Sequence, residues 1–190
     1  MLTIEMIFGI LLAGLLSDNY ALLHFLGTGA VMENERSTKQ SIVLGLGTTL
    51  VMLITNAICW PLNTYLLEHV PYLQTMVFVL VILIVVEVLH IIAKKLLDGY
   101  CHADFVKFAI NGAILGLCIH NVEHHLSYVE TLITSLGVGL GLMVTMCIFA
   151  KIKDEPVDEE AIPASFRGLP IALLTAGMIV LAFMALQFKF

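Results

Sequence analysis

The chain has 190 residues, of which 59% are hydrophobic and only 13% are charged, and its mean hydropathy is +0.99. A soluble domain of this size has too little interior to bury so much apolar surface, so the composition excludes an ordinary soluble protein. The net charge of −6 is not accompanied by a basic stripe, which argues against nucleic acid as a partner. The composition predicts an all-α protein whose main solvent is membrane lipid.

Six apolar segments follow one another along the chain, with charged residues between them. A helix of about 20 apolar residues spans the roughly 30 Å of bilayer hydrocarbon, and each segment is of that order. The first segment lacks the basic start and small-residue cleavage site of a signal peptide, so we interpret it as a span. One membrane domain, residues 1–190, is expected. The six predicted spans are Ile4–Val31, Gln40–Leu67, Tyr72–Ala93, Ala103–Val122, Ser127–Ala150 and Gly168–Phe188.

The basic residues predict the orientation of these spans, because cytoplasmic loops retain Lys and Arg. With six spans, the loops after spans 1, 3 and 5 lie on one side of the membrane. These loops and their margins contain all the basic residues except Lys189, namely Arg36, Lys39, Lys94, Lys95, Lys107, Lys151, Lys153 and Arg167. Both termini are therefore expected outside the cell.

Spans 1 and 4 differ from the others, because polar residues interrupt them at Ser17-Asp18-Asn19 and at Asn111-Gly112. They occupy equivalent places in two three-span halves, about 1–97 and 98–190. An odd number of spans in each half forces the second half to insert upside down relative to the first, which predicts an inverted repeat. Chance similarity between apolar stretches is the alternative. A weak sequence similarity between the halves supports the repeat: Gly45-x-Gly47 with Met52 matches Gly139-x-Gly141 with Met146.

Polar or ionisable residues at membrane depth cost about 2.5–3.5 kcal/mol on insertion scales, so each needs a partner or a role. Five such residues are candidates for an ion path: Asp18, Asn19, Glu87, His90 and Asn111. Glu87 and His90 are three residues apart, so one helix face can present both to a proton or cation. The alternatives are an interfacial pair near the cytoplasmic end for Glu87 and His90, and a simple helix end for Asp18.

The segment from His120 to His125 loosely resembles a set of metal ligands, since His120 and His124 share a helical face and His125 follows. No strict motif supports a metal site, and we favour a solvated loop. The four cysteines contain no C-x-x-C pair, which argues against a sequence-local metal site. We expect them to pack as ordinary apolar residues. They are Cys59, Cys101, Cys118 and Cys147.

The C-terminal stretch from Ser165 to Met184, SFRGLPIALLTAGMIVLAFM, resembles the signature that ends proteins of the RnfA/NqrE family. This signature is long and specific. Further matches are Phe25-Leu26-Gly27, the run Gly45–Met52 and Asn111-x-Ala113-Ile114-Leu115-Gly116. Length and span count also agree, so the resemblance covers essentially the whole chain.

The resemblance implies a membrane subunit that pairs with an oppositely oriented RnfE/NqrD-like subunit. Their complex couples electron transfer to Na⁺ or H⁺ translocation across the bacterial cytoplasmic (inner) membrane. In the family a two-iron two-sulfur cluster lies between the pair, held by cysteines in the broken spans. Here Gly29 and Gly112 stand at the matching positions, so this chain is expected to bind no cluster. Cys118 lies six residues beyond Gly112, about 9 Å along a helix, and cannot replace the missing ligand there.

These observations predict a subunit that is not catalytic alone and that belongs to an ion-translocating oxidoreductase. The missing cysteines leave open a transporter-like paralogue, or a structural one, without electron transfer. No Walker loop, hydrolase triad or flavin-attachment sequence occurs in the chain.

Overall fold

The computed structural model of the protein describes residues 5, 9–11, 14, 38–67, 70–96, 112–154, 163 and 169–187. These residues form helices and turns, and no strand occurs among them. Asp18, Asn19, Gly29 and Asn111 lie outside the described residues, as does almost all of the first expected span. The structure therefore does not test the predicted interruption of span 1.

Helix α4 runs from Thr38 to Leu62 and continues into a π-helical turn, η2, from Asn63 to Leu67. Together they match the expected second span, but the change of helix type within it is a difference. Pro61 lies inside α4 and has no N–H to donate to the preceding turn, so the regular hydrogen-bond ladder is disturbed there. The Thr64 hydroxyl donates to the Trp60 carbonyl at 3.0 Å, satisfying an acceptor beside the proline.

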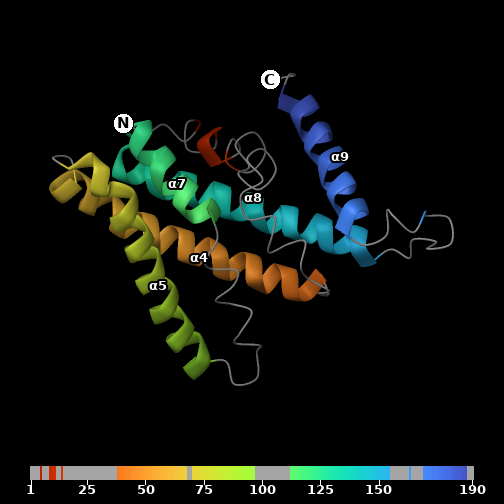
Figure 1. Ribbon diagram of the computed structural model, residues 1–190, viewed down its shortest axis with the longest axis horizontal. Coiled ribbons are helices and arrows are strands. Elements are labelled where there is room, and N and C mark those ends of the chain that lie inside the picture. The colour runs from red at the N-terminus through yellow and green to blue at the C-terminus, as the bar shows by residue number, and fades with distance from the viewer. Residues whose placement is uncertain are drawn as a thin grey trace.

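Helix α5 extends from Gln74 to Leu96 after a single 3₁₀ turn, η3, from Pro71 to Leu73. The side chain of Gln74 donates to Asn63, which joins the start of α5 to the π-helical turn. The resulting hairpin contains the expected second and third spans. Figure 1 shows α5 leaving the end of α4 at a steep angle.

A short turn joins helices α7 and α8. Helix α7 runs from Gly112 to Glu123, and α8 runs from Tyr128 to Asp154. Helix α7 ends in a Schellman motif, in which Leu126 N–H donates to Asn121 O at 3.1 Å and His125 N–H donates to Val122 O at 3.1 Å. Helix α8 starts with a capping box between Ser127 and Glu130.

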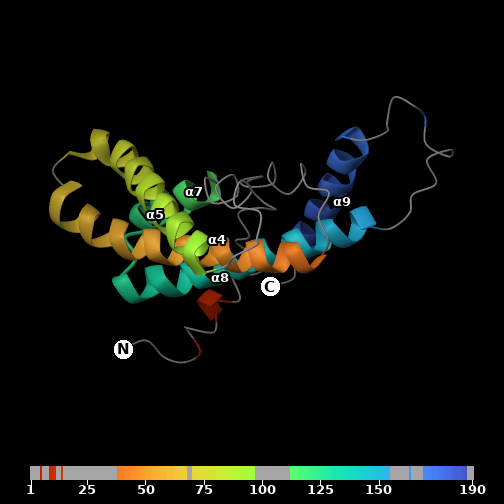
Figure 2. The ribbon, with the colours of Figure 1, turned by 90° about the horizontal axis from the view of Figure 1, so that it is seen from below.

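Helices α4 and α8 lie side by side and antiparallel, as Figures 1 and 2 show together. Small residues allow the close approach. A Cβ added to Gly45 would lie 2.9 Å from the Cα of Met143, and one added to Gly139 would lie 2.9 Å from the Cα of Thr49. Gly137, on another face of α8, approaches Gly14 near the N-terminus in the same way. Glycines here permit packing rather than turns.

The core lies where these helices meet. Its largest cluster combines side chains of α4, α5, α7 and α8 with Ala176 of α9, the helix from Leu169 to Gln187. A smaller cluster at the other end of α4 contains Cys59, Leu67, Phe78 and Cys118. The cysteines Cys59 and Cys118 are both buried and free, as expected for apolar packing.

Three of the described helices are long and apolar enough to cross a membrane: Ser41–Leu67, Pro71–Ile92 and Tyr128–Lys151. They match the expected second, third and fifth spans, so the all-α membrane fold is confirmed at this level. Helix α7 covers only the second half of the expected fourth span, and α9 contains the shorter apolar helix Leu173–Ala182. The count of six spans and the inverted repeat stay predictions.

Candidate functional site

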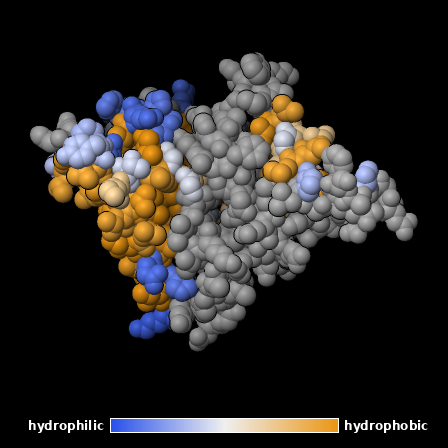
Figure 3. Space-filling view, viewed as in Figure 1, coloured by the Kyte–Doolittle hydropathy of each residue, from blue (hydrophilic) through white to orange (hydrophobic). Residues whose placement is uncertain are grey.

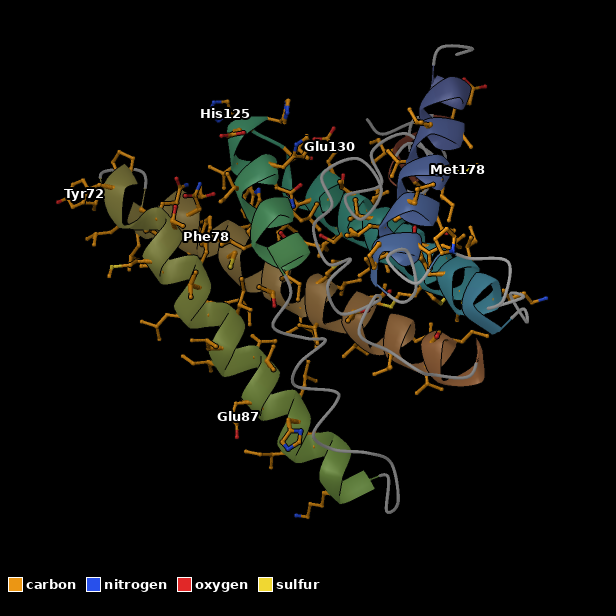
Figure 4. The ribbon with its side chains drawn as sticks, turned by 45° about the vertical axis from the view of Figure 1, so that its right-hand side comes forward. Tyr72, Phe78, Glu87, His125, Glu130 and Met178 are labelled. Atoms are coloured by element: carbon orange, nitrogen blue, oxygen red, sulfur yellow. The ribbon has the colours of Figure 1, made fainter. Side chains whose placement is uncertain are left out.

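Glu87 and His90 are the two ion-path candidates among the described residues, and both lie on α5. Glu87 is exposed, whereas His90 is half-buried. Figure 4 shows Glu87 pointing away from α4, α7 and α8. Only 22% of the spanning segment of α5 is buried, against 44% in α4 and 50% in α8, so α5 presents most of its surface outward. The structure therefore brings Glu87 to an outer face, not to the α4–α7–α8 junction.

The surroundings of Glu87 are apolar. Figure 3 shows hydrophobic side chains along α5 with hydrophilic groups toward its lower end. A carboxylate on such a surface is costly in contact with lipid, so it suits either a protein neighbour or the membrane boundary. Exposed large apolar residues of the same helix are Met76, Val79, Leu80, Leu83, Ile84, Val88, Ile91 and Ile92.

A pair of carboxamides lies buried between α4 and α7. The Asn121 side-chain N–H donates to Asn56 Oδ1 at 2.9 Å, and the Asn56 side-chain N–H donates to Met52 O at 2.9 Å. Asn56 and Asn121 are 1% and 4% exposed. Sequence reasoning missed both residues, although the rule that selected Asn111 also applies to an asparagine within the span Gln40–Leu67.

Three buried oxygens of α4, α7 and α8 have no hydrogen-bond partner in the part of the chain that the structure describes. They are the free Oδ1 of Asn121 and the hydroxyls of Thr55 and Thr131. Buried polar groups are nearly always hydrogen-bonded in folded proteins, and each exception calls for an explanation. One comes from each of the helices α4, α7 and α8.

The exceptions stand out because other buried hydroxyls in these helices do find acceptors. They donate to carbonyls three or four residues earlier, the usual solution for Ser and Thr in an apolar helix. Examples, with their acceptors, are Thr48 to Gly45 at 2.9 Å, Thr49 to Gly45 at 2.7 Å, Ser135 to Thr131 at 2.6 Å and Thr145 to Gly141 at 2.9 Å.

The histidine segment lies at the turn between α7 and α8. The rings of His120 and His124 are 4.2 Å apart with a tilt of 49°, while His124 and His125 are exposed. Among the described residues, no group of three or more His, Cys, Asp or Glu side chains is arranged to hold a metal ion. His125 has a positive φ of 49° as the residue that follows the helix cap. This segment forms the Schellman turn that ends α7.

Gly112, at one of the two positions that match family cluster cysteines, is the first residue of α7 and is exposed. Glycine has no side-chain ligand for iron. Cys118 lies farther along α7, in the buried cluster with Cys59. The first turn of α7, which the structure describes from Gly112 onward, therefore contains no cysteine thiol.

Nearly the whole chain is similar to known membrane subunits. Residues 7–189 match the family described as "Rnf-Nqr subunit, membrane protein". A relative from Syntrophotalea carbinolica, which belongs to an "Ion-translocating oxidoreductase complex", is 32% identical over 180 residues, 92% of this chain and 93% of the relative. The subunit of the same name from Vibrio vulnificus shows the same identity and coverage. A relative from Acetobacterium woodii, which belongs to a "Na(+)-translocating ferredoxin:NAD(+) oxidoreductase complex", is 29% identical with equal coverage.

Proposed function

Because the chain belongs to the Rnf-Nqr family of membrane subunits, we propose that it is an integral subunit of a complex in which electron transfer drives Na⁺ or H⁺ across the membrane. The observation that carries this proposal is the similarity along nearly the full length of both chains. A chain whose described residues lie largely in apolar helices suits a membrane subunit that works with partners.

The proposed architecture is a pair of inverted three-span halves, and the sequence match of Gly45-x-Gly47 with Gly139-x-Gly141 supports it. The same sequence separation relates Gly45 to Gly139 and Thr49 to Met143. Gly45 approaches Met143, and Gly139 approaches Thr49, so each contact is the counterpart of the other. Antiparallel packing of any two helices produces such paired contacts, so the proposed two-fold axis in the membrane plane rests on the sequence match. A structure in which spans 1 and 4 are unbroken, lipid-facing helices would contradict the repeat.

The proposed partner is an RnfE/NqrD-like subunit inserted in the opposite orientation. We further propose that this chain contributes no cluster ligand to the interface, since glycines occupy positions 29 and 112. Electrons then cross the pair by another route. The ion-path candidates in the interrupted spans remain Asp18, Asn19 and Asn111, with Glu87 and His90 on α5.

The glycines at positions 29 and 112 also favour a second candidate function. A paralogue that has lost its cluster ligands can work as a transporter, or as a structural membrane subunit, without electron transfer. A transporter would move its ion in proteoliposomes that contain this chain alone. An electron-transport subunit would not.

Purification in mild detergent tests both candidates. If the proposed function holds, flavin- or iron–sulfur-containing subunits and a paired membrane subunit copurify in fixed stoichiometry. Iron and acid-labile sulfide should then be assayed on the complex and compared with a Gly29→Cys/Gly112→Cys variant. Stoichiometric iron at the interface of the wild-type chain would defeat the no-cluster proposal. Isolation of the chain without redox partners would favour the second candidate.

A further inference from the structure

The three unpartnered oxygens of Thr55, Asn121 and Thr131 belong to helices α4, α7 and α8, and α4 packs against both of the other two. The side chains of Thr55, Asn121 and Thr131 are only 0%, 4% and 1% exposed. No described hydrogen bond satisfies them. A fold that removes three oxygens from water without partners suggests that something else binds them.

Two contacts of Trp60 show which residues of α4 lie beside the start of α8. Trp60 Nε1 of α4 donates to Leu126 O at 2.8 Å, and its ring meets that of Tyr128, at the start of α8, with centroids 5.3 Å apart. Thr55 lies five residues before Trp60, and Thr131 lies three residues after Tyr128. At about 1.5 Å per residue in antiparallel helices, both lie below the Trp60 contact in the same direction, at about 8 Å and 5 Å.

Asn121 belongs to the same level. Its amide bonds to Asn56, the neighbour of Thr55 on α4. The three oxygens therefore lie within about one helical turn of each other along the bundle, one turn beneath the α7–α8 loop. Figure 4 shows this end of the bundle, marked by the labels of His125 and Glu130.

The hydrogen bonds at this height of the bundle leave oxygen atoms, rather than N–H groups, without partners. Each of the two carboxamides already uses its NH₂ group as a donor, Asn56 to Met52 O and Asn121 to Asn56 Oδ1. The remaining group of Asn121 is an oxygen with free lone pairs. Thr55 and Thr131 do not donate to a preceding carbonyl, unlike Thr48, so their hydroxyls can also turn lone pairs inward.

We propose that the oxygens of Thr55, Asn121 and Thr131 form part of a binding site for a dehydrated alkali cation, with Na⁺ as its ligand. Neutral amide and hydroxyl oxygens are hard ligands of the kind that replace the hydration shell of such ions. Asn121 lies in the last turn of α7, where the negative end of the helix dipole favours a cation. This proposal rests on the proposed function, because it assigns the binding of the translocated ion to this subunit.

Thermal unfolding of the purified complex in NaCl, KCl and choline chloride at equal ionic strength tests the site. A ligand that binds only the folded state raises the unfolding temperature. We expect Na⁺ to stabilise the wild type above choline. Thr55→Val and Thr131→Val replace the hydroxyl with a methyl group of similar size, and each should raise the Na⁺ concentration for half-maximal stabilisation by about ten-fold or more. Asn121→Leu should abolish the effect.

The matched control is Thr64→Val, because Thr64 is an exposed threonine on the same span whose hydroxyl is already bonded to Trp60 O. It should keep the wild-type Na⁺ dependence. If the oxygens are merely unsatisfied or hold water, Thr55→Val instead stabilises the protein equally in all three salts. That result, or the absence of Na⁺-specific stabilisation of the wild type, overturns the site. The two threonine variants decide the matter even if Asn121→Leu does not fold.

Electron-driven ²²Na⁺ uptake by vesicles that contain the same complex separates this proposal from the function. Absent uptake with intact Na⁺-specific stabilisation refutes the translocation function and supports the site. Normal uptake combined with an unchanged Na⁺ dependence in Thr55→Val and Thr131→Val refutes the site and supports the function.

Discussion

At the scale of single residues, the buried polar side chains of the apolar helices are the informative ones. Sequence reasoning selected Glu87 and His90 because they are ionisable at membrane depth, but it passed over Asn56 and Asn121. Their pairing depends on two residues far apart in the chain, and no local pattern predicts it. Which hydroxyls lack an acceptor is likewise decided only by packing.

Glu87→Gln tests whether the carboxylate on α5 belongs to an ion path. Glutamine keeps the size and hydrogen-bonding capacity of the side chain but removes the charge. Electron-driven ion uptake should fall by at least about ten-fold while the complex assembles normally. Glu123→Gln, at the exposed end of α7, is the control and should leave uptake unchanged. If the Glu87→Gln variant takes up ions as fast as the wild type across the pH range, Glu87 is an interfacial residue with no role in the ion path.

At the scale of elements, helix lengths followed from the apolar runs, since α4 with η2, η3 with α5, and α8 match three expected spans. The π-helical turn after Pro61 was not predicted, although the proline inside the run was a visible signal. Packing partners were less accessible to prediction. The match of Gly45-x-Gly47 with Gly139-x-Gly141 predicted equivalent positions in two halves, but the close contacts of Gly45 with Met143 and of Gly139 with Thr49 required the structure.

Gly139→Ala should weaken the packing of α4 against α8. Its new methyl group would come within 2.6 Å of the Thr49 methyl carbon and 2.9 Å of the Thr49 backbone, so the helices must separate. We expect a loss of about 1–3 kcal/mol in the free energy of unfolding, measured by denaturant titration in detergent. Gly177→Ala on α9 meets nothing within 4 Å and should be neutral or stabilising. Equal effects of the two substitutions would refute the close contact.

His125→Gly should stabilise the turn between α7 and α8. His125 has a φ of 49°, a left-handed conformation in which its Cβ crowds the following carbonyl, and glycine removes that strain. Greater freedom of the unfolded glycine offsets part of the gain, so the net increase in unfolding free energy is about 1 kcal/mol or less. His124→Gly, one residue earlier, should destabilise. A destabilised His125→Gly variant would contradict the Schellman assignment.

At the scale of the whole molecule, composition and apolar run length were sufficient to predict an all-α membrane protein. The similarity along residues 7–189 agrees with the resemblance drawn from the C-terminal signature. The interrupted spans stay a prediction, since Asp18, Asn19, Gly29 and Asn111 lie outside the described residues. Span orientation depends on insertion into a membrane, which helix packing alone does not determine.

Cysteine labelling tests the predicted orientation. In a variant without native cysteines, single cysteines at Glu159 and at Phe190 should react oppositely with a membrane-impermeant maleimide. In intact cells Phe190→Cys should be labelled and Glu159→Cys protected, because the basic residues flank the loop that contains Glu159. Permeabilised cells, in which both positions should react, are the control. Labelling of Glu159→Cys in intact cells would show that this loop lies outside and would contradict the predicted orientation.

The central claim, that the chain is a working subunit of an electron-driven ion pump, is tested most directly by ion uptake into inverted membrane vesicles. Vesicles from cells with and without the gene receive NADH or reduced ferredoxin, and Na⁺ and H⁺ uptake are followed. The account predicts uptake that needs both the donor and this chain, and that returns when the gene is restored. Undiminished electron-driven uptake without the chain, or uptake by the purified chain alone without any donor, would contradict it.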